Sequence, residues 1–231
     1  MKSLFGLKDS ELKGETYFGI KPYKDELQPD YDNLDKEIKL KDDLEWGEDE
    51  HFQNLLRKAD IWSDYLIDGL TIVEAEFKIY EQDQRVDILY LDNNGLLIPC
   101  ELKVSGDKKD THGQLIRYMS DICSANTNMD FVKAKFEQFL QKFSEKEIRK
   151  LHEKKLNEFI KTHKITKIST SPFRGIIIDN GFRPQLKKAV EHLNNKCNFD
   201  ITLIKVTAKV NNSWAKSADE YLFRLDFSQI N

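Results

Sequence analysis

Alternation of apolar and polar residues marks the middle of this chain as a β-sheet. Residues 70–80 alternate with a period of two, which predicts a half-exposed strand. Two more strand patterns follow at 85–92 and 96–103, separated by Asn93-Asn94-Gly95. Later apolar runs predict strands over 173–179, 201–206 and 221–227, the last closing a sheet edge.

Helical periodicity separates these strands. Apolar positions three and four residues apart predict helices over 46–59, 113–124 and 184–193, and a long helical stretch over 129–163 that has room for two helices. Residues 1–45 show weak periodicity and read as an irregular arm with at most one short helix. The order of helices and strands predicts an α/β (α+β) layered fold.

Composition narrows the class of protein. The 231 residues carry a net charge of −4, which argues against wholesale non-specific binding to nucleic acid, yet residues 131–170 hold eleven Lys/Arg against five Asp/Glu. No apolar run reaches the ~20 residues of a membrane span, and Lys2 is not followed by the apolar stretch of a secretory signal. Three distant cysteines fit neither a disulfide framework nor a zinc site. We expect a soluble, reduced, cytoplasmic protein.

The turn between the two central strands decides where their acidic residues lie. Asn93-Asn94-Gly95 suits a three-residue loop with Gly95 in the left-handed conformation, which pairs Asp92 with Leu96 and places Asp87 opposite Glu101. A two-residue loop would shift the register by one and put the two acids on opposite faces.

The face that holds the two acids is otherwise mostly apolar. Facing carboxylates repel each other, and burying them without compensation costs several kcal/mol, so the pattern calls for cations. Lys103 is one candidate, and Mg²⁺, which prefers oxygen ligands, is a second. The alternative is a purely structural pair between Asp87 and Lys103.

Two neighbouring helices carry further candidates. Glu48 lies on the apolar stripe of its helix, either as an N-terminal acid favoured by the helix dipole or as a third carboxylate for a metal. Gln114 and Tyr118, four residues apart, share one helical face, with Arg117 beside them.

Together, Val86-Asp87-Ile88, Glu101-Leu102-Lys103 and the segment from Gln114 to Tyr118 resemble the PD-(D/E)xK nuclease superfamily. The resemblance is closest to the RecB-type branch and to the catalytic domain of the NucS endonucleases. It covers residues 46–125 and extends loosely to 206. One departure is Val86, where those branches usually have proline before the first acid.

The resemblance implies a fold and a site. The fold would be a restriction-endonuclease-like three-layer core, with a mixed central sheet flanked by helices, within a nuclease-like domain over 46–231. The resemblance does not explain residues 1–45, which the weak periodicity predicts as an N-terminal arm, or 126–170, which are predicted as a basic helical insertion. Metal ligands would be Asp87, Glu101, Glu48 and the backbone carbonyl of Leu102, holding Mg²⁺, for which Mn²⁺ would substitute. Lys103 would act on the attacking water, Gln114 and Tyr118 would shape the site, and weaker nucleic-acid contacts would come from Arg117, Lys108 and Lys109.

The expected function is therefore a Mg²⁺-dependent DNA endonuclease acting in repair or in restriction and defence. It would act on DNA, either by itself, as a homodimer or together with a protein partner. No membrane is expected to take part. The alternative is a catalytically inactive or partner-dependent nucleic-acid-binding module on a nuclease-like fold.

Overall fold

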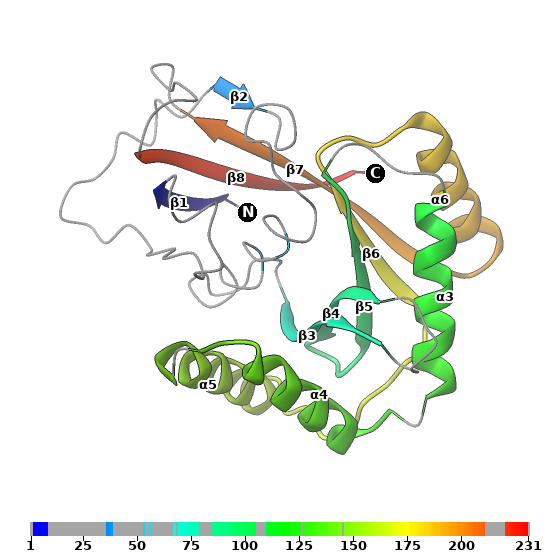
Figure 1. Cartoon of the computed structure of the whole chain (residues 1–231). Coiled ribbons are helices and arrows are strands. Elements are labelled where there is room, and N and C mark those ends of the chain that lie inside the picture. Colours follow the sequence, from blue (N-terminus) through cyan, green and yellow to red (C-terminus); the bar gives the residue numbers. More distant parts are fainter. Residues whose placement is uncertain are drawn as a thin grey trace.

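A computed structural model gives the architecture of the protein (Figure 1). It describes residues 2–8, 36–38, 53, 56, 67, 69–78, 85–104, 110–125, 127–144, 146–210 and 220–230.

One mixed sheet organises the described chain. Its strand order is β1-β8-β7-β6-β5-β4-β3, and β2 also pairs with β7. Strands β5, β6 and β7 run parallel to one another, whereas β3–β4–β5 and β7–β8–β1 are antiparallel. The strands are β1 (Lys2–Lys8), β2 (Lys36–Ile38), β3 (Leu70–Phe77), β4 (Val86–Asp92), β5 (Leu97–Leu102), β6 (Arg174–Asp179), β7 (Asp200–Val210) and β8 (Glu220–Ile230).

Helices flank this sheet in two groups (Figure 1). Helices α3 (Thr111–Ser124) and α6 (Pro184–Lys196) pack against β5, β6 and β7, whereas α4 (Met129–Gln141) and α5 (Lys146–Thr162) pack at the β3 end. The predicted α/β class, with a mixed sheet flanked by helices, is confirmed, and the basic stretch forms two helices. Within the described residues, no helix is both long and apolar enough to cross a lipid bilayer.

The predicted register of the central hairpin is confirmed. Strands β4 and β5 pair Ile88 with Cys100 and Leu91 with Leu97, and the Asp92 amide donates to the Leu96 carbonyl at 3.0 Å. Gly95 has φ +82°, the left-handed conformation that a three-residue loop needs. Continuing this register one residue beyond Ile88 and Cys100 brings Asp87 opposite Glu101.

We expect Gly95→Ala to destabilise the protein by about 1–3 kcal/mol. A Cβ at this position would clash with the Lys167 carbonyl oxygen, in addition to the unfavourable φ. Thermal unfolding measures the effect, and Gly181→Ala is the matched control because a Cβ there has nothing within 4 Å. Equal melting temperatures for the two variants would contradict the turn assignment.

Three differences from expectation come from long-range packing. Residues 2–8 and 36–38, predicted as irregular, are strands β1 and β2. Strand β8 does not close the edge, because β1 pairs outside it. Strand β3 was predicted to be half-exposed, but its residues from Leu70 to Ala75 are all buried, because α4 and α5 cover them. The predicted helix over 46–59 lies outside the described residues, apart from Gln53 and Leu56.

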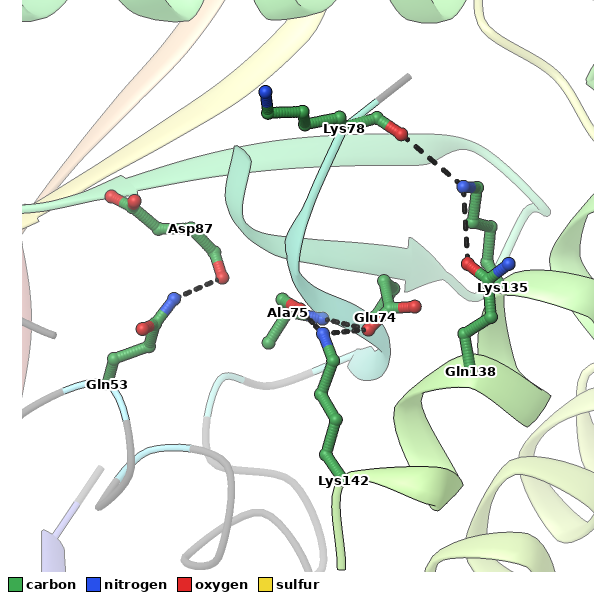
Figure 2. A network of polar contacts seen from close by, with 8 residues as sticks. All are labelled: Gln53, Glu74, Ala75, Lys78, Asp87, Lys135, Gln138 and Lys142. Atoms are coloured by element: carbon green, nitrogen blue, oxygen red, sulfur yellow. Dashed lines mark hydrogen bonds and ion pairs between the residues drawn. The ribbon is translucent and has the colours of Figure 1, made fainter. Parts of the chain in front are cut away.

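A buried ion pair fastens α4 to β3 (Figure 2). The carboxylate of Glu74, 1% exposed, accepts hydrogen bonds from Lys142 Nζ at 2.8 Å and from the Ala75 amide at 2.9 Å. Lys142 also donates to the Ala75 carbonyl, and Lys135 donates to the Lys78 carbonyl at 3.4 Å. Burial raises the pKa of Glu74 above its ordinary 4.5, although Lys142 opposes that shift.

This raised pKa makes stability depend on pH with a definite sign. The folded state binds the Glu74 proton more tightly than the unfolded state, so the resulting stabilisation is complete below the ordinary carboxyl pKa and is lost as pH rises through the raised one. Glu74→Gln keeps the hydrogen-bonding oxygen but never ionises. We expect its melting temperature to rise relative to wild type as the pH is raised from the ordinary carboxyl pKa through the raised pKa of Glu74. A difference that stays constant over this range would contradict the expectation.

Candidate active site at the end of the central hairpin

The predicted acids meet where β5 ends and β4 begins. Glu101 and Lys103 are buried, with 2% and 4% exposure, while Asp87 is half-buried. Glu101 is level with Ile177 on β6, and Leu115 of α3 packs against Gly175 on the same face. Helix α3 therefore covers the face that carries the acids.

Lys103 folds back over the end of its own strand. Its backbone amide donates to the Ile178 carbonyl at 2.8 Å, which fixes the main chain against β6. Its Nζ lies 2.5 Å from Glu101 Oε1 and 2.8 Å from the Leu102 carbonyl oxygen. The Lys103 ammonium thus already contacts Glu101 Oε1 and the Leu102 carbonyl oxygen, two of the atoms that were expected to bind a metal ion.

Both the side chain and the backbone carbonyl of Asp87 accept hydrogen bonds. Its Oδ2 accepts a hydrogen bond from the Leu102 amide at 2.7 Å, which places the carboxylate beside the end of β5. Its backbone carbonyl accepts from Gln53 Nε2 at 2.6 Å (Figure 2). The Lys103 ammonium pairs with the Glu101 carboxylate.

Gln53 is a site residue that sequence reasoning missed. Its side chain is 1% exposed, and within the described residues its Oε1 has no hydrogen-bond partner. Gln53 lies outside the apolar stripe that predicts the helix over 46–59. The sequence around it, His51-Phe52-Gln53-Asn54, offers no signal that singles it out.

Helix α3 brings one of its predicted residues fully into the site. Tyr118 is buried, and burial raises the pKa of its hydroxyl, with further contributions from the charges of Glu101 and Asp87 and from a hydrogen bond to Glu101. The phenol therefore stays protonated and acts as a donor. Gln114, one turn earlier, is half-buried.

Of the remaining predicted residues, Arg117 alone lies in the described part of the chain. Arg117 is exposed and lies 3.9 Å from the Asp110 carboxylate, an ion pair at the surface. Glu48, Lys108 and Lys109 lie outside the described residues, so their places in the site stay predictions.

Asp179 is a second missed residue. It ends β6, is fully buried, and is paired in register with Lys205 on β7. Because Glu101 is level with Ile177, the register places Asp179 beside Lys103 on the same face. Lys103, Asp179 and Lys205 therefore lie side by side across three parallel strands, at the carboxyl ends of β5 and β6 and in the middle of the longer β7. Its sequence signal was an acid after Ile176-Ile177-Ile178, directly before Asn180-Gly181.

The oxygen atoms present suit a hard divalent cation. Two carboxylates and a strand carbonyl are ligands that Mg²⁺ accepts, and the Lys103 ammonium shows that Glu101 Oε1 and the Leu102 carbonyl can hold positive charge. Within the described residues, no three His, Cys, Asp or Glu side chains are grouped as metal ligands. The groups that suit a metal ion are the carboxylates of Asp87 and Glu101 and the Leu102 carbonyl. The Lys103 ammonium would have to move away from Glu101 and Leu102 before a metal ion could bind there.

Cys100 does not take part. It follows the opposite face of β5, and burial raises the pKa of its thiol well above the ordinary value, with added repulsion from Asp87 and Glu101. A protonated, buried thiol is a poor metal ligand and a poor nucleophile.

Comparison with known proteins gives no match: no family model, no curated protein and no solved structure matches the chain.

Proposed function

We propose that the protein is a Mg²⁺-dependent endonuclease of the PD-(D/E)xK type that hydrolyses phosphodiester bonds of DNA. The observation that carries the proposal is the convergence of Asp87, Glu101 and the Leu102 carbonyl, with Lys103, on one end of the central hairpin. This geometry agrees with the resemblance in the sequence. It depends on the three-residue turn at Asn93-Asn94-Gly95, which sets the register of β4 and β5.

The residues divide the chemistry among them. A bound Mg²⁺ would lower the pKa of a water ligand and offset negative charge on the phosphate. Asp87 and Glu101 would supply the carboxylate ligands, with the Leu102 carbonyl between them. Lys103, once released from these oxygens, is the ammonium that would orient the attacking water or neutralise a phosphate oxygen.

The helix above the acids would support them. The Tyr118 hydroxyl, kept protonated, donates to Glu101 and holds that carboxylate in place. Gln114 would face the nucleic acid from the same side of α3. Glu48 as an outer ligand, with Arg117, Lys108 and Lys109 as backbone contacts, completes the proposed set, in a cytoplasmic enzyme of DNA repair or of restriction and defence.

Cleavage assays test the proposal directly. Wild-type protein is incubated with Mg²⁺, with Mn²⁺ or with EDTA, on single-stranded, duplex and branched DNA and on RNA. Cutting of DNA that requires the metal supports the proposal, and cutting of RNA alone would replace the substrate. No cutting of any nucleic acid by the folded protein would overturn it.

The closed Glu101–Lys103 pair favours one second candidate. Because the ammonium lies on the oxygens that a metal would use, a nuclease-like module that binds nucleic acid without cutting, or that cuts only with a protein partner, also fits this arrangement. Binding of DNA without cleavage in the same assays would select that candidate.

A further inference from the structure

Four lysines form a straight, exposed ridge on α5. Lys146, Lys150, Lys154 and Lys161, together with Asn157, fall within about 80° of the helix circumference, and all five are exposed. No acidic residue lies inside this sector, since Glu147, Glu153 and Glu158 fall outside its borders. We call these four lysines the α5 ridge.

Helix stability accounts for only part of the α5 ridge, because Lys161 in the last turn suits the helix dipole but the other three lysines do not. Lysine pairs four residues apart, Lys146 with Lys150 and Lys150 with Lys154, repel each other, and a lysine in the first turn opposes the helix dipole. Glutamates lie three residues from Lys150 and from Lys161, but the ion pair formed on the ridge is that of Lys154 with Glu158 at 3.8 Å. Within the described residues, no ion pair is present at Lys146, Lys150 or Lys161.

The opposite face of α5 fixes the ridge in place. His152, Leu156 and Phe159 are buried, and the His152 ring lies 4.9 Å from the Phe139 ring and 4.7 Å from the Phe143 ring. The apolar face of α5 is thus used inside the protein. That face is therefore not available for insertion into lipid, and the exposed lysines are left to act through their charge.

We propose that the α5 ridge binds the phosphate backbone of nucleic acid. Lys146, Lys150 and Lys154 lie about 6 Å apart along the axis and Lys161 about 10 Å further on, so the ridge is about 22 Å long, a row of positive charge suited to a polymer with regularly spaced negative charges. It lies in the segment 131–170, where basic residues outnumber acidic ones by eleven to five in a chain of net charge −4. Helix α5 packs near β3, next to the strand that carries Asp87. The inference rests on the proposed function and names the surface that holds its substrate.

The test measures binding without metal, so that it does not depend on cleavage. Affinity for a labelled DNA duplex and for a single strand is measured in EDTA across a salt series, for wild type and for the triple variant K146Q/K150Q/K161Q. Removing three phosphate contacts should weaken binding at low salt about tenfold or more and make the slope of log affinity against log salt shallower by about 2–3. The matched control is K187Q/K188Q/K196Q on exposed positions of α6, which removes the same charge from another helix.

Each outcome decides the proposal. A loss confined to the α5 variant, with an unchanged melting temperature, supports it. Equal losses in both triple variants would show a diffuse charge effect and overturn it, as would full affinity of the α5 variant. Vesicles of anionic lipid serve as a second probe, and a loss of vesicle binding without a loss of DNA binding would assign the ridge to a membrane instead. If the proposed nuclease activity is wrong but the ridge proposal is right, the wild type will bind DNA through the ridge and will not cut it.

Discussion

Asp87→Asn should abolish metal-dependent cleavage and leave the fold intact. The asparagine carbonyl can still accept the hydrogen bond from the Leu102 amide that Asp87 Oδ2 accepts at 2.7 Å. The charge that would bind Mg²⁺ is lost, and several kcal/mol of transition-state stabilisation correspond to a hundredfold or greater fall in rate. The melting temperature in EDTA should be unchanged or higher, because repulsion from Glu101 is relieved.

Asp92→Asn is the matched control, since it is the same substitution at the other end of the same strand. Asp92 Oδ1 accepts the Asn94 and Leu96 amides at 2.8 Å each, and its Oδ2 lies 3.3 Å from Arg174. We expect this variant to lose about 1–3 kcal/mol of stability while it cuts normally when folded. Full activity of Asp87→Asn would remove Asp87 from the chemistry, and a marked fall in its melting temperature would assign it a structural role.

Lys103→Met should destabilise the metal-free protein and make it respond more strongly to Mg²⁺. Methionine keeps the length of the side chain but leaves the buried Glu101 carboxylate without its cation, which costs about 3–5 kcal/mol. Because Glu101 Oε1 and the Leu102 carbonyl are no longer held by the ammonium, added Mg²⁺ should raise the melting temperature more than it does in wild type. Cleavage should be lost, since the ammonium that acts on the water is gone.

Denaturant unfolding in EDTA and in Mg²⁺ measures both effects. Lys187→Met, on the exposed surface of α6, is the control and should change stability by less than about 0.5 kcal/mol. If Lys103→Met is as stable as wild type and responds equally to Mg²⁺, then the ammonium does not compete with a metal for these oxygens.

Local chemistry explains why the centre of the site could be predicted. The position of Gly95 fixes the loop length, the loop fixes the register, and the register places Asp87 opposite Glu101, so each step depends on neighbouring residues only. The four helices that the structure places at 111–196 follow from the same kind of local periodicity.

Contacts between distant segments were beyond such reasoning. Gln53 is identified only by its contact with the carbonyl of Asp87, 34 residues away. Asp179 matters because β6 pairs in parallel with β5, an arrangement that no spacing in the sequence reveals. The burial of Glu74 could likewise not be predicted, because its partner Lys142 lies 68 residues later in the chain, at the end of α4.

The pairing of β1 with β8 has a consequence for how the protein folds. Lys2 lies opposite Asp226, so β1 finds its partner only after more than two hundred further residues have been added. Closing so long a loop is slow compared with forming the β4–β5 hairpin, whose paired residues are near neighbours in the chain. The hairpin that carries the acids can therefore form early on the ribosome, while the far edge of the sheet is completed last.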